Sequence, residues 1–98
     1  MRTIPHYIDG ERVEGPGGSD VFNPATGEVT AQVPVPATVF IDHVVDVAVN
    51  AATQWGQSTL SRRTNILFSL RQLLVDHTDE FAAIITSEHG KTLADAKG

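Results

Sequence analysis

No cysteine occurs among the 98 residues of this chain. Its absence excludes a disulfide framework, a thiolate metal site and a cysteine nucleophile within the chain, and a cytoplasmic location is expected. Basic residues are also few, because 7 lysines and arginines stand against 12 aspartates and glutamates, giving a net charge of -5. They are scattered apart from the pair Arg62 and Arg63. Nucleic-acid binding needs a basic patch that neutralises phosphates and is therefore not expected.

Long apolar runs are missing as well. The longest, at residues 41–49, is interrupted by Asp42, His43 and Asp46, whereas a membrane-spanning helix needs about 20 apolar residues. The first residues lack the apolar core of a secretory signal. With 41% hydrophobic and 19% charged residues, the composition is typical of a globular domain, and no membrane partner is expected.

Residues 1–36 have the pattern of strands and turns. Four short extended segments are predicted, at residues 5–9, 11–14, 21–22 and 28–35. The Asp-Gly pair at residues 9–10 and the segment 23–27 are turn signals. The glycines within residues 15–19 predict a flexible loop. Pro34 and Pro36 either end the last strand or confine it to a sheet edge.

Residues 38–98 have the pattern of three helices and the beginning of a fourth. Apolar residues recur with the period of an α-helix in three stripes. The stripes are Ile41, Val44, Val45, Ala48, Val49, Ala52 and Trp55; Ile66, Leu67, Leu70, Leu73 and Leu74; and Phe81, Ala82, Ile84 and Ile85. N-caps are expected at Thr38, Ser61 and Thr78, and helix ends at Gly56 and Gly90, followed by a fourth helix within residues 91–97. The predicted fold class is therefore α+β, with an antiparallel hairpin region followed by three to four helices.

The three stripes are too small to stabilise the chain by packing on one another. Their burial gains less free energy than the conformational entropy lost when about 50 helical residues become ordered. We therefore expect the stripes to pack against protein outside this chain. We also expect the isolated chain to self-associate through Leu67, Leu70, Leu74, Phe81 and Ile85.

Two glycine-containing segments resemble nucleotide-binding motifs but have the wrong spacing. Gly90-Lys91-Thr92 lacks the earlier glycine of a phosphate-binding loop, because Ile85 occupies that position. A helix end followed by a new helix is the simpler interpretation. The glycines within residues 15–18 precede a short strand and do not lie between a strand and a helix, as a dinucleotide fingerprint requires.

No catalytic, cofactor-binding or metal-binding residue is predicted. The four histidines, His6, His43, His77 and His89, are not spaced as metal-binding pairs. No serine has the Gly-x-Ser-x-Gly setting of a nucleophile, and Asp42 with Asp46 is typical of a solvated helix face. Arg62 and Arg63 at a helix start oppose the helix dipole. They indicate either a carboxylate partner outside the chain or a solvated pair.

Several segments, taken in order, resemble the N-terminal section of the aldehyde dehydrogenase superfamily. They are Tyr7-Ile8-Asp9-Gly10, Phe22 to Val29, Ile41 to Trp55, Arg63 with Ile66-Leu67, residues 79–82, and Glu88-His89-Gly90-Lys91. Within the superfamily, residues 4–10 and 88–98 are most similar to the CoA-acylating methylmalonate-semialdehyde branch. Arg62, Val47 and Asn50 depart from the residues that are usual in the superfamily.

The resemblance implies that residues 1–98 are the N-terminal portion of a cofactor-binding domain in an enzyme with a Rossmann-like α/β fold. It implies oxidation of methylmalonate semialdehyde, or a related semialdehyde, to an acyl-CoA such as propionyl-CoA, with NAD and a cysteine thiolate. The superfamily's thiolate, base and cofactor turn belong to later parts of its chains. The expected role of this chain is therefore scaffolding, without NAD binding or activity alone, and its expected partner is the remainder of the dehydrogenase. The alternative is a freestanding helical module that binds another protein.

Overall fold

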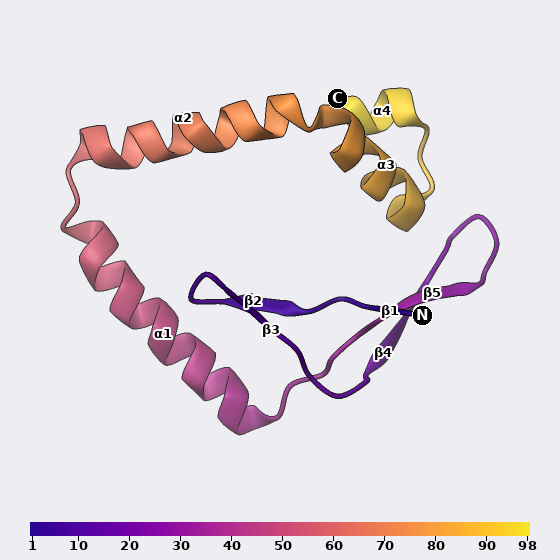
Figure 1. Cartoon of the computed structure of the whole chain (residues 1–98), viewed down its shortest axis with the longest axis horizontal. Coiled ribbons are helices and arrows are strands. Elements are labelled where there is room, and N and C mark those ends of the chain that lie inside the picture. The colour runs from indigo at the N-terminus through magenta and orange to yellow at the C-terminus, as the bar shows by residue number, and fades with distance from the viewer. The chain divides into compact units, whose positions relative to one another are not determined.

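The computed structural model describes residues 1–98 and divides into two compact units. The first comprises Met1–Val21 and Val29–Gln57, and the second comprises Phe22–Glu28 and Ser58–Gly98. Strands β1 to β5 come first along the chain and helices α1 to α4 follow (Figure 1). The expectation of an α+β chain is therefore confirmed.

The antiparallel hairpin lies in the first unit and consists of β2 (His6–Ile8) and β3 (Glu11–Val13). The two connecting residues, Asp9 with φ 54° and Gly10 with φ 75°, both have positive φ. This is the geometry of a type I′ turn, whose twist matches that of the strands it joins. The predicted hairpin and its turn are confirmed, with strands slightly shorter than expected.

A second sheet contains β1 (Arg2–Thr3), β5 (Val29–Val33) and β4 (Ser19–Phe22), in the order β1-β5-β4. β1 runs parallel to β5 and was not expected, because two residues are too few to show a periodicity. β5 is the central strand and ends at Val33. Of the two roles considered for Pro34, ending the strand is correct, because proline cannot donate to the hydrogen-bond ladder.

The predicted turn at residues 23–27 is confirmed in the second unit. Asn23 Oδ1 accepts a hydrogen bond from Ala25 N at 2.9 Å, and Gly27 N donates to Asn23 O at 2.8 Å. Pro24 lies against Gly90, where an added methyl group would be 3.3 Å from Pro24 Cγ. The turn is thus packed against the end of α3.

The four helices are α1 (Thr38–Gly56), α2 (Leu60–Asp76), α3 (Thr78–His89) and α4 (Leu93–Lys97). α1 ends at the expected Gly56. α3 is capped by Gly90 in the left-handed conformation with φ 86°, which confirms the expected helix end. α4 confirms the predicted fourth helix. Its N-cap is Thr92, whose hydroxyl accepts a hydrogen bond from Asp95 N at 3.3 Å.

The three predicted N-caps are wrong by one or two residues. α1 is preceded by Ala37, which makes no side-chain cap bond. α2 is capped by Thr59, whose hydroxyl accepts from Arg62 N at 3.2 Å. α3 is preceded by His77, while the Thr78 hydroxyl donates to carbonyls at the end of α2. At α2, the extended backbone of Thr59 lets its hydroxyl cap the helix, whereas the predicted Ser61 already lies inside it.

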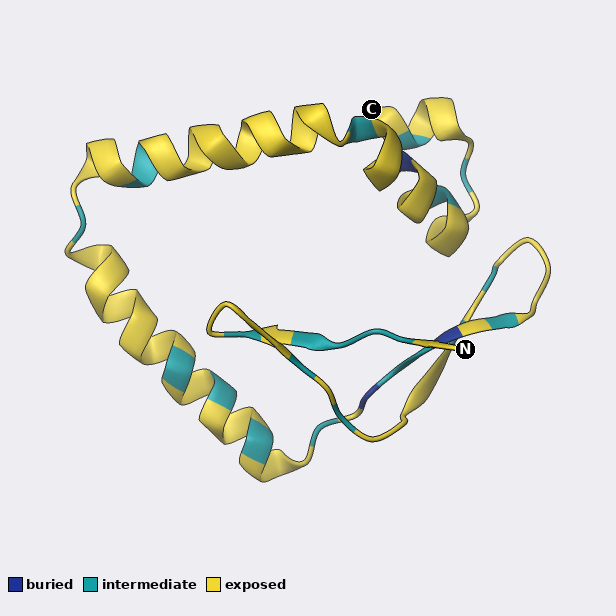
Figure 2. Ribbon diagram, in the orientation of Figure 1, coloured by how far each residue is buried: buried dark blue, intermediate teal, exposed yellow.

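Very little of the chain is buried (Figure 2). Ala31 and Ala82, at 0% and 1% exposure, are its buried hydrophobic residues. The predicted stripes on α1 and α2 contribute no buried residue. No helix of the structure combines the length and apolar character that crossing a bilayer requires.

The half-buried side of α1 differs from the predicted stripe. Phe40, Val44 and Val47 are half-buried and recur at the spacing of one helix face, while Val45 and Val49 of the predicted stripe are exposed. Val47 lines a shallow cleft together with the tip of the β2–β3 hairpin. The helix therefore has apolar residues on two sides. One side packs within the first unit, and the other is not covered by that unit.

Candidate functional site

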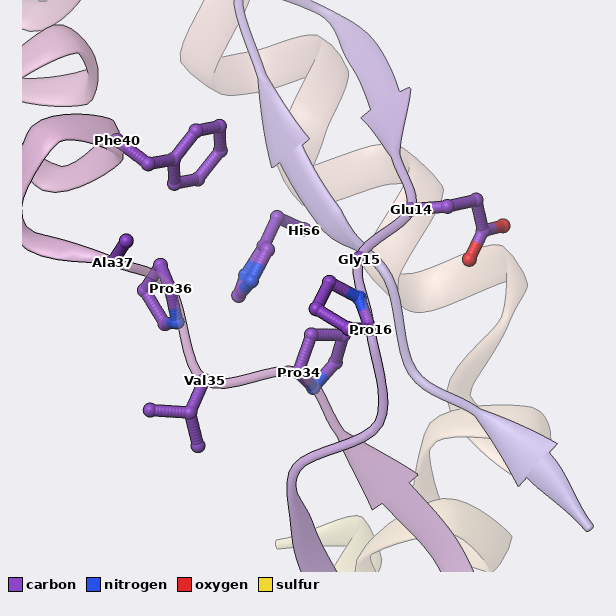
Figure 3. Close-up of a pocket in the computed structure, with 9 residues that line it drawn as sticks. All are labelled: His6, Glu14, Gly15, Pro16, Pro34, Val35, Pro36, Ala37 and Phe40. Atoms are coloured by element: carbon purple, nitrogen blue, oxygen red, sulfur yellow. The ribbon is translucent and has the colours of Figure 1, made fainter.

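A pocket of about 310 Å³ lies in the first unit, between the hairpin, the residues after β5 and the start of α1 (Figure 3). Its lining consists of His6, Glu14, Gly15, Pro16, Pro34, Val35, Pro36, Ala37 and Phe40. The ring centroids of His6 and Phe40 are 5.8 Å apart, with an interplanar angle of 39°. The prolines and rings make the walls mostly apolar, so the pocket favours an apolar occupant.

The polar groups of this pocket do not form a reacting pair. Figure 3 shows the Glu14 carboxylate turned away from the other lining residues, and it accepts a hydrogen bond from Arg12 Nε at 2.6 Å. His6 Nε2 is buried and has no hydrogen-bond partner. A general acid or base needs a second reacting group within hydrogen-bond reach. Glu14 and His6 therefore do not form such a pair in this pocket.

The glycines of residues 15–18 lie in a loop between β3 and β4, as expected. A methyl group added at Gly18 would collide with the carbonyl oxygen of Val33 and lie 2.7 Å from Val35 N. Glycine here permits close approach of two backbone segments. The chain's own backbone fills this space, so packing accounts for the glycine at position 18.

Gly90-Lys91-Thr92 joins two helices, as the sequence indicates. Gly90 N donates to Thr86 O at 2.8 Å and closes α3. Thr92 then caps α4 through its bond with Asp95 N. These contacts need no phosphate ligand to explain them, because each residue satisfies backbone groups at a helix end.

The histidines and acidic residues do not gather into a metal site. No group of three or more histidine, aspartate or glutamate side chains could hold a metal ion. His77 Nδ1 lies 3.1 Å from Glu80 Oε1, while His43 and His89 are exposed. Among the serines, Ser87 donates its hydroxyl proton to Ile84 O at 2.7 Å, which is a local helix contact.

Arg62 and Arg63 have different environments at the start of α2. Arg62 is exposed, whereas Arg63 is half-buried. Arg63 Nε is buried without a hydrogen-bond partner, and the first turn of α2 contains no acidic residue. The exposure of Arg62 fits a solvated side chain, whereas no hydrogen-bond partner of Arg63 Nε is found within the chain.

An ion pair that sequence reasoning missed connects α3 and α4. Lys97 Nζ lies 2.8 Å from Asp79 Oδ1. The hydrogen bond from Lys97 and the positive charge of its ammonium group lower the pKa of the Asp79 carboxyl below its ordinary value. The two residues are far apart in sequence, so no helix-face spacing could have indicated their contact.

A further candidate functional surface is the uncovered apolar face of α2. The α2 stripe, defined as Leu67, Leu70 and Leu74, is 57%, 50% and 45% exposed. Further exposed apolar residues of the second unit include Phe81 and Ile85 on α3. Soluble monomers rarely expose contiguous apolar patches beyond a few hundred Å², so such a face is typical of a surface that binds protein.

Comparison with known proteins identifies the family. The profile described as the Aldehyde dehydrogenase family matches residues 13–98. The chain belongs to the aldehyde dehydrogenase family. The resemblance inferred from the sequence motifs is therefore confirmed.

Relatives in this family match the chain over its whole length. Malonate-semialdehyde dehydrogenase of Listeria monocytogenes serotype 4a (strain HCC23) is 44% identical over 100 residues, which cover 100% of this chain and 20% of the relative. Malonate-semialdehyde dehydrogenase 2 of Oceanobacillus iheyensis is also 44% identical, with 100% and 21% covered. The chain thus spans about a fifth of the length of the curated relatives it matches.

Solved aldehyde dehydrogenase structures contain the same fold. A structure assigned as a methylmalonate-semialdehyde dehydrogenase from Sinorhizobium meliloti 1021, complexed with NAD, superposes with a TM-score of 0.91 and 40% identity. It covers 100% of this chain and 20% of the other. An aldehyde dehydrogenase from Brucella melitensis biovar abortus 2308 superposes with a TM-score of 0.88 at 32% identity, covering 96% of this chain and 20% of the other.

Proposed function

We propose that this chain is the N-terminal portion of an NAD-dependent, CoA-acylating dehydrogenase. Its substrate is methylmalonate semialdehyde, which would yield propionyl-CoA, or a related semialdehyde such as malonate semialdehyde. One observation carries the proposal: a relative named malonate-semialdehyde dehydrogenase is 44% identical over 100% of the chain. The NAD complex of a structural neighbour supports the choice of cofactor.

Within that enzyme we assign residues 1–98 to the cofactor-binding domain. Their role there is to support the fold, and they do not supply reacting groups. The chain has no cysteine and so cannot itself supply a thiolate nucleophile. Its exposed helix stripes suit contact with the rest of the enzyme. The role is therefore structural, and chemistry is the task of the remaining chain.

The isolated chain tests the assigned role. Purified 98-residue protein is mixed with methylmalonate semialdehyde, NAD and CoA, and NADH formation is followed by absorbance. We expect no turnover, and no saturable NAD binding by calorimetry. Genuine turnover by the chain alone would contradict the scaffolding role.

The substrate assignment is tested on the complete enzyme. Under this proposal the complete enzyme contains residues 1–98 at its N-terminus, and that enzyme is assayed with methylmalonate, malonate and succinate semialdehydes. We expect NAD reduction with the first two, and a CoA thioester detected by mass spectrometry. Release of a free acid that is independent of CoA would contradict the CoA-acylating assignment.

The second candidate function is a freestanding module that binds another protein through the α2 stripe. The exposure of that stripe is the observation that favours it. A dehydrogenase lacking its first 100 or so residues, a length set by the matching region of the relatives, is mixed with this chain. Restored activity supports the dehydrogenase segment. Tight binding to an unrelated protein, without restored activity, supports the module.

A further inference from the structure

Asp9, at the tip of the β2–β3 hairpin, differs from every other aspartate of the chain in two respects. It is followed by glycine, and it lies outside the helices and strands. Each of the others is followed by a residue with a side chain and lies in β4 or in one of the four helices: Asp20, Asp42, Asp46, Asp76, Asp79 and Asp95. Because glycine has no side chain, the peptide nitrogen after Asp9 is sterically open to a neighbouring group.

Neither the carboxyl group of Asp9 nor the peptide nitrogen of Gly10 is engaged by the rest of the chain. Both residues are exposed, and no heavy atom lies within 4 Å of a methyl group added at Gly10. Gly10 N takes part in none of the backbone hydrogen bonds found outside the helices and strands. The ion pairs of the chain all involve other residues. The two groups are therefore free to approach each other once the turn changes conformation.

The conformation of the turn is inexpensive to leave. Asp9 has a φ of 54°, a left-handed value that costs energy for any residue with a side chain. The hairpin has two strands and three residue pairs, His6 with Val13, Tyr7 with Arg12, and Ile8 with Glu11. Two-stranded hairpins are marginally stable, and exposed loop tips open locally far below the free energy of global unfolding.

We propose that Asp9 is a site of spontaneous isoaspartate formation in the folded chain. When the tip opens, Gly10 N attacks Asp9 Cγ, a C–N bond forms, and the amide proton leaves with the carboxyl hydroxyl as water. Water then adds to the resulting succinimide at its main-chain carbonyl, which breaks the original peptide bond and leaves the chain running through Cγ. Addition at Cγ instead restores aspartate. The net reaction changes no mass and needs no enzyme, oxidant or cofactor.

The modification would change the hairpin, because the isoaspartyl linkage adds one carbon to the backbone of a two-residue connection. A type I′ turn has no room for an extra backbone atom, so the pairing of Ile8 with Glu11 would be strained. Asp9 also lines the cleft beside Val47 and Asn50 of α1. The change would therefore weaken the β2–β3 pairing and alter the contact of its tip with α1.

Ageing of the purified chain tests the site. One sample is kept at physiological temperature in neutral buffer, where circular dichroism confirms that it stays folded, and another in guanidinium chloride. Trypsin releases residues 3–12 as one peptide, and electron-transfer fragmentation distinguishes its aspartyl and isoaspartyl forms. Dividing the rate of each aspartate in buffer by its own rate in denaturant removes the effect of the following residue. We expect this ratio to be at least about tenfold larger for Asp9 than for Asp20, because the tip opens more readily than β4.

The comparison with Asp20 makes the result decisive. A ratio for Asp9 as small as that for Asp20, or no isoaspartate at Asp9 in the folded chain, would overturn the proposal. Asp9→Glu lengthens the side chain and disfavours ring closure, so it should remove the modified form of the peptide and leave the rate at Asp20 unchanged. In the purified isoaspartyl chain, the amides of β2 and β3 should exchange with solvent faster than in the unmodified chain. The outcome does not depend on the enzymatic activity proposed above.

Discussion

At the scale of single residues, Gly18 lies where the segment between β3 and β4 passes over the backbone of Val33 to Val35. The atoms that a side chain would meet there belong to backbone and cannot swing aside. Close approach of the two segments, and not conformational freedom, is therefore what requires glycine at this position.

Gly18→Ala should destabilise the chain by about 1–3 kcal/mol, because overpacking forces a backbone shift. Gly17→Ala is the matched control, since its methyl group would lie 3.2 Å from the flexible end of Gln32. Urea unfolding followed by circular dichroism gives the free energy of unfolding of each variant. Equal midpoints for the two variants would show that the contact at Gly18 is not tight.

The Asp79–Lys97 ion pair predicts how the stability of the contact between α3 and α4 depends on pH. The folded pKa of Asp79 is lowered by Lys97, so the stabilisation is present above the unfolded pKa of an aspartate. It is lost as the pH falls through the lowered folded pKa. We expect the contact between α3 and α4 to weaken in that acidic window and to be unaffected near neutral pH.

Lys97→Met should raise the pKa of Asp79 toward its ordinary value, because both the hydrogen bond and the positive charge are removed. Lys91→Met removes the other lysine and serves as the control. The pKa is measured from the carboxyl carbon shift of Asp79 by NMR. A titration midpoint that Lys97→Met leaves unchanged would contradict the pairing.

At the scale of elements, the helix starts show what separates a plausible cap from the actual one. Thr59 and Ser61 are both capping residue types, and both lie near the start of α2. Only Thr59 has the extended backbone of a cap, with φ -64° and ψ 153°, and its hydroxyl bonds Arg62 N. Ser61 already lies inside the helix.

Thr59→Ala should lower the free energy of unfolding by about 1 kcal/mol, the typical loss for a removed N-cap. Ser61→Ala should change it by less than about 0.5 kcal/mol, because alanine is the better helix former inside a first turn. Urea unfolding by circular dichroism compares the two variants. A larger effect of Ser61→Ala would mean that the helix begins later than Leu60.

At the scale of the whole molecule, this chain has two buried alanines as its hydrophobic core. Its stability must therefore depend on what covers its helices. For the isolated chain the available cover is another copy, so we expect it to self-associate through the α2 stripe with Phe81 and Ile85, since each buried leucine contributes roughly 1.5–3 kcal/mol.

Light scattering checks this prediction on the purified chain. We expect a mass above that of the monomer, which Leu67→Gln, Leu70→Gln and Leu74→Gln together should bring down toward the monomer value. Asn65→Gln with Ser69→Gln changes the other side of α2 and should not alter the mass. A monomer mass for the unchanged chain at high concentration would show that its apolar faces do not associate.

The sequence alone was sufficient where the signal is local. Residues 9–10 and 23–27 form turns because their Asp-Gly and Asn-Pro chemistry acts within a few residues, and Gly90 ends α3 for the same reason. The period of the apolar residues likewise predicted each long helix, and the motifs were sufficient to indicate the aldehyde dehydrogenase family.

Only the tertiary structure decided which residues meet across long separations. It placed β1 beside β5, packed Gly18 against residues 33–35, joined Asp79 to Lys97, and made Phe40, Val44 and Val47 the half-buried row of α1. It also distinguished Arg63 from Arg62. Helical periodicity says that a residue lies on an apolar face, but contact with that face depends on distant segments, which carry no mark in the local sequence.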